Sequence, residues 1–461
     1  HSTSRRQRQM CIRDRYLDGA YGWDQFDENK VSSRVMDYVA GNLSETGENS
    51  VFRTKLCEAS LLEYMFATDN DGTGMLRQAS AYMKRHLPED VAKKMYQQYQ
   101  DGKKAEADGK TEYSVEDADQ AIINAKKEKE QADQNDKEGA PQEEAGEKNI
   151  QDNENNHAQD AEDGKKESPI QIVLQLKQNA LLGMTVSDMS SLSAKAVEAK
   201  DMVSNRQCET GRYDMKKAEK MNVSDRVMVL EYIGKHFSDY TEPGKGDLTY
   251  EMEYILCGKD TDKKNLESSI ERLMRMREAA NVAHIIADRE KLNQTLMIAT
   301  SLAGFSGNPA VVKIVQIGVV AAWAYVESIL DLRTLLSGGK ISLIKSAAEW
   351  TTDLKKLGEI VTGEGKAREC KNGLSYQAYI KQLLFAMKEK KMAYRMMDIM
   401  ELAMQKEQNG KNARMDHMID NMICELRFEA KPLFAKRSFY GDMEKGGYTF
   451  FKRQKLSYIN E

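Results

Sequence analysis

Two carboxylates four residues apart give the strongest chemical signal in this sequence. Glu327 and Asp331 lie in the nearly all-apolar stretch Val311–Leu336, where helical spacing would place both on one face. Carboxylates in apolar surroundings can act as a general acid and base. A buried structural ion pair is the favoured interpretation, because cations are available to neutralise the two acids. A solvent-facing pair is the third alternative. The candidate cations are Arg333, Arg277 and Lys313.

A second pair of carboxylates, Asp69 and Asp71, begins the stretch Asp69–Gly74. Calcium loops place oxygen ligands at the first and third positions and a glycine at the sixth, as this stretch does. The twelfth position holds Ser80, where a calcium loop needs a bidentate glutamate. A turn is therefore the favoured interpretation, and a calcium site is the weaker alternative.

Other catalytic motifs are incomplete. The stretch Gly338–Lys340 ends like a phosphate-binding loop, but Thr334 stands where the first glycine of that motif belongs. The stretch Gly304–Gly307 resembles a nucleophile elbow, but Asn308 replaces its second glycine. None of the six histidines are spaced as a helical zinc pair, and none of the six cysteines form a C-x-x-C pair. The sequence therefore predicts no cofactor and no metal beyond the weak calcium candidate.

Composition indicates a globular protein with one unusually polar section. The chain has 461 residues, 40% hydrophobic and 31% charged, and its net charge of −5 gives no indication of nucleic-acid binding. Only 6 prolines and 7% aromatic residues favour a helix-rich α+β fold over an all-β sandwich. The 26 methionines suit helical cores, where methionine fills gaps.

The chain divides by composition. Residues 1–15 resemble a translated sequencing adapter and are excluded from the fold prediction, the alternative being a basic arm that binds lipid or nucleic acid. The acidic segment 101–168 has too few apolar residues to form a core and is expected to be a disordered insertion. The remaining parts are an N-terminal part of the body, 16–100, and a main body, 169–461, with a helical core at 261–408 and a C-terminal hairpin at 416–459.

Apolar periodicity predicts the main elements of the body. The segment Tyr250–Cys257 alternates and predicts a strand, whereas a helix is expected to begin near Asp262. The apolar stretch 292–336 predicts two buried helices joined by a turn before Pro309. A membrane hairpin is the alternative, disfavoured by the cost of two acids in lipid. The residues between Leu343 and Leu357 predict one more amphipathic helix.

The C-terminal part predicts a small antiparallel sheet. In Ile423–Lys431, apolar and charged residues alternate cleanly, as in a half-buried strand. Gly446 and Gly447 precede another β-prone segment, so a terminal β-hairpin with a long loop is expected. The expected further strands of this sheet are Tyr250–Cys257 and Phe52–Phe66. The two strand-like segments contain Cys257 and Cys424, which leaves one disulfide open.

Several segments together resemble an uncharacterised bacterial family. Its members occur mainly in anaerobic Gram-positive bacteria, are often encoded beside tight-adherence (Tad/Flp) pilus genes, and carry an N-terminal hydrophobic helix like that of pseudopilins. Cys257 stands where the family usually has a small residue, which argues against a required disulfide. The similar segments are Leu17–Gly22, Tyr250–Leu266, Arg277–Asn281, Ala322–Asp331, Leu335–Lys340, Tyr394–Asp398 and Tyr448–Phe450.

This resemblance implies a non-enzymatic structural or assembly component of a pilus-like apparatus in the cell envelope. It implies an extracellular body, a membrane anchor in an N-terminal helix that this sequence lacks, and partners among other envelope or pilus-assembly proteins. The alternative hypothesis, from the residues alone, is a soluble enzyme or small-molecule-binding protein that uses Glu327 and Asp331. A deep pocket around the two acids would favour the alternative.

Overall fold

The chain folds into two compact units, each formed from separate stretches of sequence. Unit 1 comprises residues 1–97, 194–265 and 384–461, and unit 2 comprises residues 98–193 and 266–383. The described residues of the computed structural model are 26–47, 52–87, 94, 96–97, 99–100, 120, 122–127, 168–213, 221–303, 308–357, 365–406, 412–432 and 448–457. Residues 1–15 and most of the segment 101–168 lie outside them, as do the expectations placed there.

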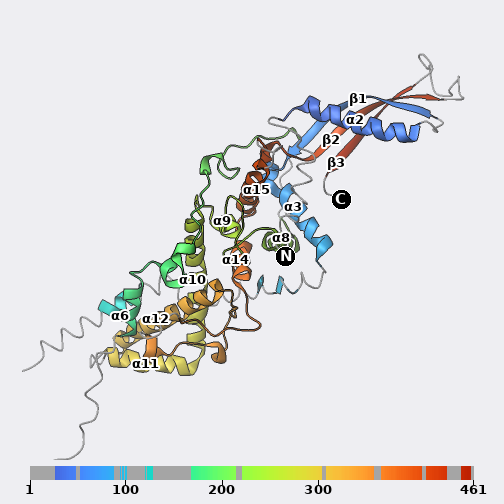
Figure 1. The fold of residues 1–461 in the computed structure, drawn as a ribbon. Coiled ribbons are helices and arrows are strands. Elements are labelled where there is room, and N and C mark those ends of the chain that lie inside the picture. The colour runs from blue at the N-terminus through green and yellow to red at the C-terminus, as the bar shows by residue number, and fades with distance from the viewer. Residues whose placement is uncertain are drawn as a thin grey trace, which may run out of the picture. The chain divides into compact units, whose positions relative to one another are not determined.

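A three-stranded antiparallel sheet forms one part of unit 1 (Figure 1). Its order is β1 (Phe52–Phe66), β2 (Ile419–Pro432) and β3 (Tyr448–Ser457), so the central strand comes from the C-terminal part of the chain. The α+β class and the C-terminal hairpin are thus confirmed, and β1 is the additional strand expected at Phe52–Phe66.

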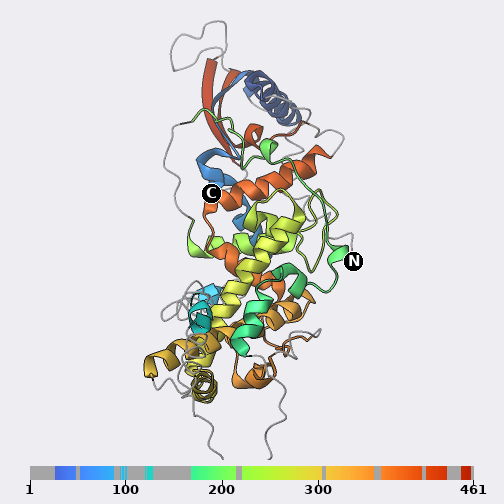
Figure 2. The ribbon, with the colours of Figure 1, turned by 90° about the vertical axis from the view of Figure 1, so that its left-hand side faces the viewer.

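One face of the sheet is covered by α2 (Glu28–Gly47), which lies along it in Figures 1 and 2. Val31 of this helix packs with buried side chains of β1 and β2. The alternation of β2 explains the core: its inward residues are buried, and the charged residues between them are not. The inward residues are Cys424, Leu426, Phe428 and Ala430.

Helices complete unit 1. They are α3 (Asp69–His86), α8 (Val223–His236), α9 (Glu251–Cys257) and α15 (Glu389–Gln405). The helix α3 packs against both α8 and α15. Gly72 permits the second contact, because a Cβ there would lie 2.7 Å from Cβ of Ala393, and its φ of +73° also favours glycine.

The prediction of a strand at Tyr250–Cys257 is wrong, because residues 251–257 form the helix α9. All seven residues of this helix are buried, so polarity does not distinguish one face and the apolar spacing imitates a strand. Its acids serve the preceding loop: Glu251 accepts a hydrogen bond from Ser238 N and Glu253 accepts one from Tyr240 N, each at 2.9 Å. Cys257 and Cys424, both described, form no disulfide.

Unit 2 is helical. Its elements include α6 (Pro169–Leu176), α7 (Leu181–Thr185), α11 (Arg289–Leu302), α12 (Pro309–Leu336), most of α10 (Asp262–Ala287) and most of α14 (Tyr376–Phe385). The long helix α12 packs against α6, α7 and α11. By length and composition, α12 is the one helix among the described residues that could cross a membrane. Of its apolar 18-residue stretch, 61% is buried inside the protein.

The two predicted buried helices differ in their burial. The helix α12 is buried along most of its length. The helix α11 buries only Thr295 and Ala299 and leaves 73% of Met297 exposed, so its predicted burial is wrong. The amphipathic helix expected between Leu343 and Leu357 is also wrong. That segment contains short 3₁₀ turns at Ala347–Glu349 and Leu354–Lys356.

Candidate functional site

The two acids of the strongest sequence signal lie inside unit 2, on α12. Pro309 at the first turn and the Asn308 side chain, which accepts a hydrogen bond from Ala310 N at 3.0 Å, begin this helix. Glu327 and Asp331 follow one turn apart on its buried part, and each is 0% exposed. At such positions a carboxylate must be neutralised by hydrogen bonds and cations from neighbouring segments.

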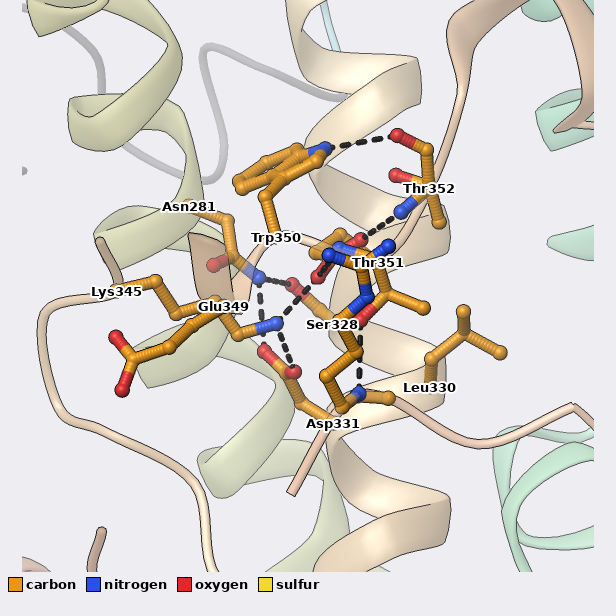
Figure 3. A network of polar contacts seen from close by, with 12 residues as sticks. Asn281, Ser328, Leu330, Asp331, Lys345, Glu349, Trp350, Thr351 and Thr352 are labelled. Carbon is orange, nitrogen blue, oxygen red and sulfur yellow. Dashed lines mark hydrogen bonds and ion pairs between the residues drawn. The ribbon is translucent and has the colours of Figure 1, made fainter. Parts of the chain in front are cut away.

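Asp331 is held by different partners at its two oxygens. Its Oδ2 accepts hydrogen bonds from Arg277 Nε and from Asn281 Nδ2, each at 3.0 Å. Arg277 Nη2 also lies 3.0 Å from this oxygen. Among the described residues, Oδ1 makes no hydrogen bond, and its close contact is the ion pair with Lys345 Nζ at 2.5 Å. Figure 3 shows the Lys345 side chain reaching toward Asp331.

Glu327 is bound to the same lysine and to the loop that follows it. Its Oε1 contacts Lys345 Nζ and accepts a hydrogen bond from Thr351 N at 3.1 Å. Its Oε2 accepts a hydrogen bond from Thr352 N at 2.9 Å. These two amides are thereby diverted from helical hydrogen bonding, which explains why the expected helix between Leu343 and Leu357 does not form.

Arg277, from α10, connects Asp331 to the loop that carries Lys345. Its Nη1 donates hydrogen bonds to the carbonyl oxygens of Ser342 at 3.0 Å and Leu343 at 2.9 Å, and to the Tyr379 hydroxyl at 2.9 Å. Burial lowers the Arg277 pKa, but the electrostatic interactions with Tyr379 and Asp331 more than offset this effect, so its pKa lies above the ordinary arginine value. Burial raises the pKa of Tyr379 to about 12.

Aromatic rings cover the network. The Trp323 and Trp350 rings meet edge to face with centroids 5.5 Å apart, and the Lys345 Nζ lies 5.8 Å from the Trp350 centroid. Both indoles are fixed by one residue: Trp323 Nε1 donates to Thr352 Oγ1 at 2.8 Å, and Trp350 Nε1 donates to Thr352 O at 3.0 Å. The Trp350 ring therefore lies beside the Lys345 ammonium group, and all four charged side chains are closed off from solvent.

We call Glu327, Asp331, Lys345 and Arg277 the unit 2 network. It contains two acids and two bases, and all four side chains are 0% exposed. Its formal charges sum to zero, which is the condition under which buried charges are tolerated.

Comparison with known proteins identifies the family. A model described as "Family of unknown function (DUF5702)" matches residues 159–430, more than half of the 461 residues. The chain belongs to this family. No protein of curated function and no solved structure matches the chain. The unit 2 network lies entirely within the part that the family model covers.

The unit 2 network differs from the cluster expected from the sequence in its second cation. Arg333 is directed elsewhere, with its Nε donating to Met184 O at 2.7 Å and its Nη1 donating to Gly365 O at 3.3 Å. Its placement beside the two acids was wrong. Lys313 lies at an exposed position of α12. Lys345 takes the expected role instead, and nothing in its sequence spacing distinguishes it from other lysines.

The weak calcium candidate lies in unit 1, outside the family match. Asp69 is buried, and its Oδ2 accepts hydrogen bonds from Phe66 N at 2.7 Å and Gly211 N at 3.0 Å. Asp71 instead pairs with Lys390 at 2.8 Å. Asn70 and Asp71 have positive φ, so the stretch is a left-handed turn merged with the start of α3. Among the described residues, no group of three or more metal-ligating side chains could hold an ion.

Unit 1 contains a second network that sequence reasoning missed. Arg206 Nη2 lies 2.7 Å from Glu401 Oε2 and 2.5 Å from Asp416 Oδ1, and Arg414 Nη2 lies 2.7 Å from Asp416 Oδ2. Burial raises the Asp416 pKa, but Arg414 and Arg206 lower it more, so it lies well below the usual aspartate range. We call Arg206, Glu401, Asp416 and Arg414 the unit 1 network. Arg206 is far in sequence from the other three residues, and nothing in the spacing of the four predicts that they meet.

Proposed function

We propose that this chain is a non-enzymatic structural component of the cell envelope, contributing to a pilus-like apparatus of the tight-adherence type. The observation that carries the proposal is the state of Glu327 and Asp331. These two acids are the strongest catalytic candidates in the sequence, and both are fully buried and neutralised by Lys345 and Arg277. Carboxylates that are buried and paired with cations in this way favour a role in holding the fold together over a role in converting an external substrate.

The cellular location of the proposal comes from the segments that resemble the pilus-associated family. Among them, Arg277–Asn281 and Ala322–Asp331 supply both ends of the Arg277–Asp331 ion pair. The segments that carry the resemblance thus include residues that hold the helical unit together. This supports a role in which the body is a stable scaffold and its partners are other envelope or pilus-assembly proteins.

Location and accessibility test this proposal. In a bacterium that encodes the chain, intact cells are treated with an external protease, and the protein is followed with an antibody. We expect it in the envelope fraction and degraded from outside. A cytoplasmic enzyme and a known surface protein serve as matched controls. Recovery in the cytoplasmic fraction, protected like the cytoplasmic control, would reject an envelope role and favour the soluble alternative.

The membrane anchor has a separate test. The proposal expects the intact gene to encode about 20 consecutive apolar residues upstream of Tyr16. Sequencing the gene from an intact genome, together with its neighbours, gives the result directly. An intact coding sequence without such a segment would reject the anchor, and neighbours unrelated to pilus assembly would reject the Tad-type assignment.

A further inference from the structure

The unit 2 network places a primary amine against a carboxyl group in the fully buried interior of unit 2. Lys345 Nζ lies 2.5 Å from Asp331 Oδ1 and also contacts Glu327 Oε1, and all three side chains are 0% exposed. An amine and a carboxyl group held together without bulk water have a high effective concentration for condensation. We propose that Lys345 and Asp331 form an intramolecular isopeptide bond, with Glu327 transferring the proton.

The reaction needs no reagent from outside the protein. Lys345 enters as an ammonium group with three protons and Asp331 as a carboxylate. The amine nitrogen forms a bond to the Asp331 carboxyl carbon, and the bond from that carbon to Oδ1 breaks. One proton remains on the amide nitrogen, and the other two leave with Oδ1 as water. The reactants carry one positive and one negative charge, the products carry none, and no atom is oxidised or reduced.

Each oxygen of Asp331 is placed for its part in this reaction. Oδ2 faces the Arg277 guanidinium and the Asn281 amide, which are donors suited to the negative charge that develops on that oxygen when the nitrogen attacks. Oδ1 contacts Lys345 Nζ and makes no hydrogen bond to any other described residue, so its departure breaks no hydrogen bond to a third group. The donors at Oδ2 remain in place for the amide carbonyl of the product.

Glu327 has the position required of a proton carrier. Its Oε1 contacts Lys345 Nζ, and Nζ in turn contacts Asp331 Oδ1. The carboxylate can therefore take a proton from the ammonium group and deliver it to the leaving oxygen. The hydrogen bonds from Thr351 N and Thr352 N fix its orientation. After the reaction, the new amide N–H can donate to the same Glu327 oxygen.

Burial also favours the product. Two of the four charges disappear on condensation, and Glu327 and Arg277 remain as one acid and one base. A buried neutral amide has a far smaller desolvation cost than a buried ammonium and carboxylate. The unit 1 network provides the contrast, because its cations are arginines, whose guanidinium groups stay protonated and do not supply a neutral amine.

The mass of the full-length chain tests the bond. The denatured wild-type protein should weigh one water less than its sequence requires, and tandem mass spectrometry of a digest should find Asp331 and Lys345 in one branched peptide. The branched peptide excludes a cyclic imide, which also loses one water. A wild-type mass equal to the calculated value, in a sample with native circular dichroism, would overturn the proposal, as would a water loss that maps elsewhere.

Variants separate the roles of the three residues. Lys345→Arg keeps the charge but should show the calculated mass, and Glu327→Gln should also lose the link. Glu349→Gln is the matched control, because this nearby acid binds Ser342 and Ser346 instead of Lys345, and the variant should keep the water loss. A linked Glu327→Gln protein would overturn the proton role. The wild-type branched peptide decides the main question even if a variant fails to fold. The proposal does not rest on the envelope role, so either can fail alone.

Discussion

The two charged networks of this protein have the same composition of charges but different chemistry. Each contains two acids and two bases. In the unit 2 network all four side chains are 0% exposed. In the unit 1 network, 15% of Arg206 and 37% of Arg414 are exposed, and both cations are arginines. A count of charges therefore says little about function, whereas the identity of one cation and the degree of enclosure decide what a network can do.

The largest loss of stability is expected on substitution of Arg277, which bonds to α12, to the loop that follows α12 and to Tyr379 of α14. Arg277→Met removes the cation from Asp331 Oδ2, which keeps only the Asn281 amide among its described donors, and it removes a donor from two carbonyl oxygens. We expect a loss of about 3–5 kcal/mol in the free energy of unfolding of unit 2. Urea denaturation followed by tryptophan fluorescence measures it. In a Trp23→Phe background the reporters are Trp323 and Trp350, both in unit 2.

Arg333→Met is the matched control for that prediction. Arg333 is a basic residue of unit 2 that binds carbonyl oxygens but no acid of the network. Its loss should cost only about 1 kcal/mol. Equal effects of the two substitutions would show that the buried ion pair contributes nothing beyond ordinary hydrogen bonds.

The same change in the unit 1 network should cost less. Arg206→Met leaves Glu401 and Asp416 without a shared cation, but water and Arg414 can compensate in part, so we expect about 2 kcal/mol. Hydrogen exchange measured by mass spectrometry locates the effect, because Met415 N donates to Glu401 at 2.7 Å and should exchange faster in the variant. We expect the effect of Arg206→Met to stay within unit 1. Faster exchange in peptides of α12, which belongs to unit 2, would contradict this expectation.

A pH experiment gives the smallest expected change. Burial raises the pKa of Asp398 in α15, although Ser204 N and the Tyr254 hydroxyl donate to its oxygens. The stability contribution of a raised pKa is fully present below the ordinary value of 3.8 and is lost as pH rises through the folded value. Asp398→Asn should therefore remove part of the decline in unit 1 stability with rising pH over that interval.

Urea denaturation at a series of pH values, followed by circular dichroism, measures this difference. Asp260→Asn is the control, because that exposed aspartate of unit 1 has a lowered pKa and acts in the opposite direction. Identical pH profiles for Asp398→Asn and the wild type would show that Asp398 titrates equally in the folded and unfolded chains.

Sequence patterns predicted elements whose two faces differ in polarity. The alternation from Ile423 to Lys431 predicted β2 because the sheet has one buried face. Patterns failed where a helix is buried on all sides, as α9 is. They also failed where backbone amides donate to a side chain distant in sequence, as those of Thr351 and Thr352 donate to Glu327. Lys345 could not be assigned to the network, because only the path of the loop between α12 and α14 brings it to the two acids.

The sheet order has a consequence for synthesis on the ribosome. The strand β1 pairs with β2 over residues that begin at Phe52 and Ile419, so β1 is made long before its partner exists. Residues 266–383 of unit 2 all emerge first. At a translation rate of about 5–20 residues per second, β1 waits tens of seconds for β2. During this time a nascent chain must keep a 15-residue strand from pairing with neighbouring polypeptides, which makes β1 a candidate for chaperone binding before release.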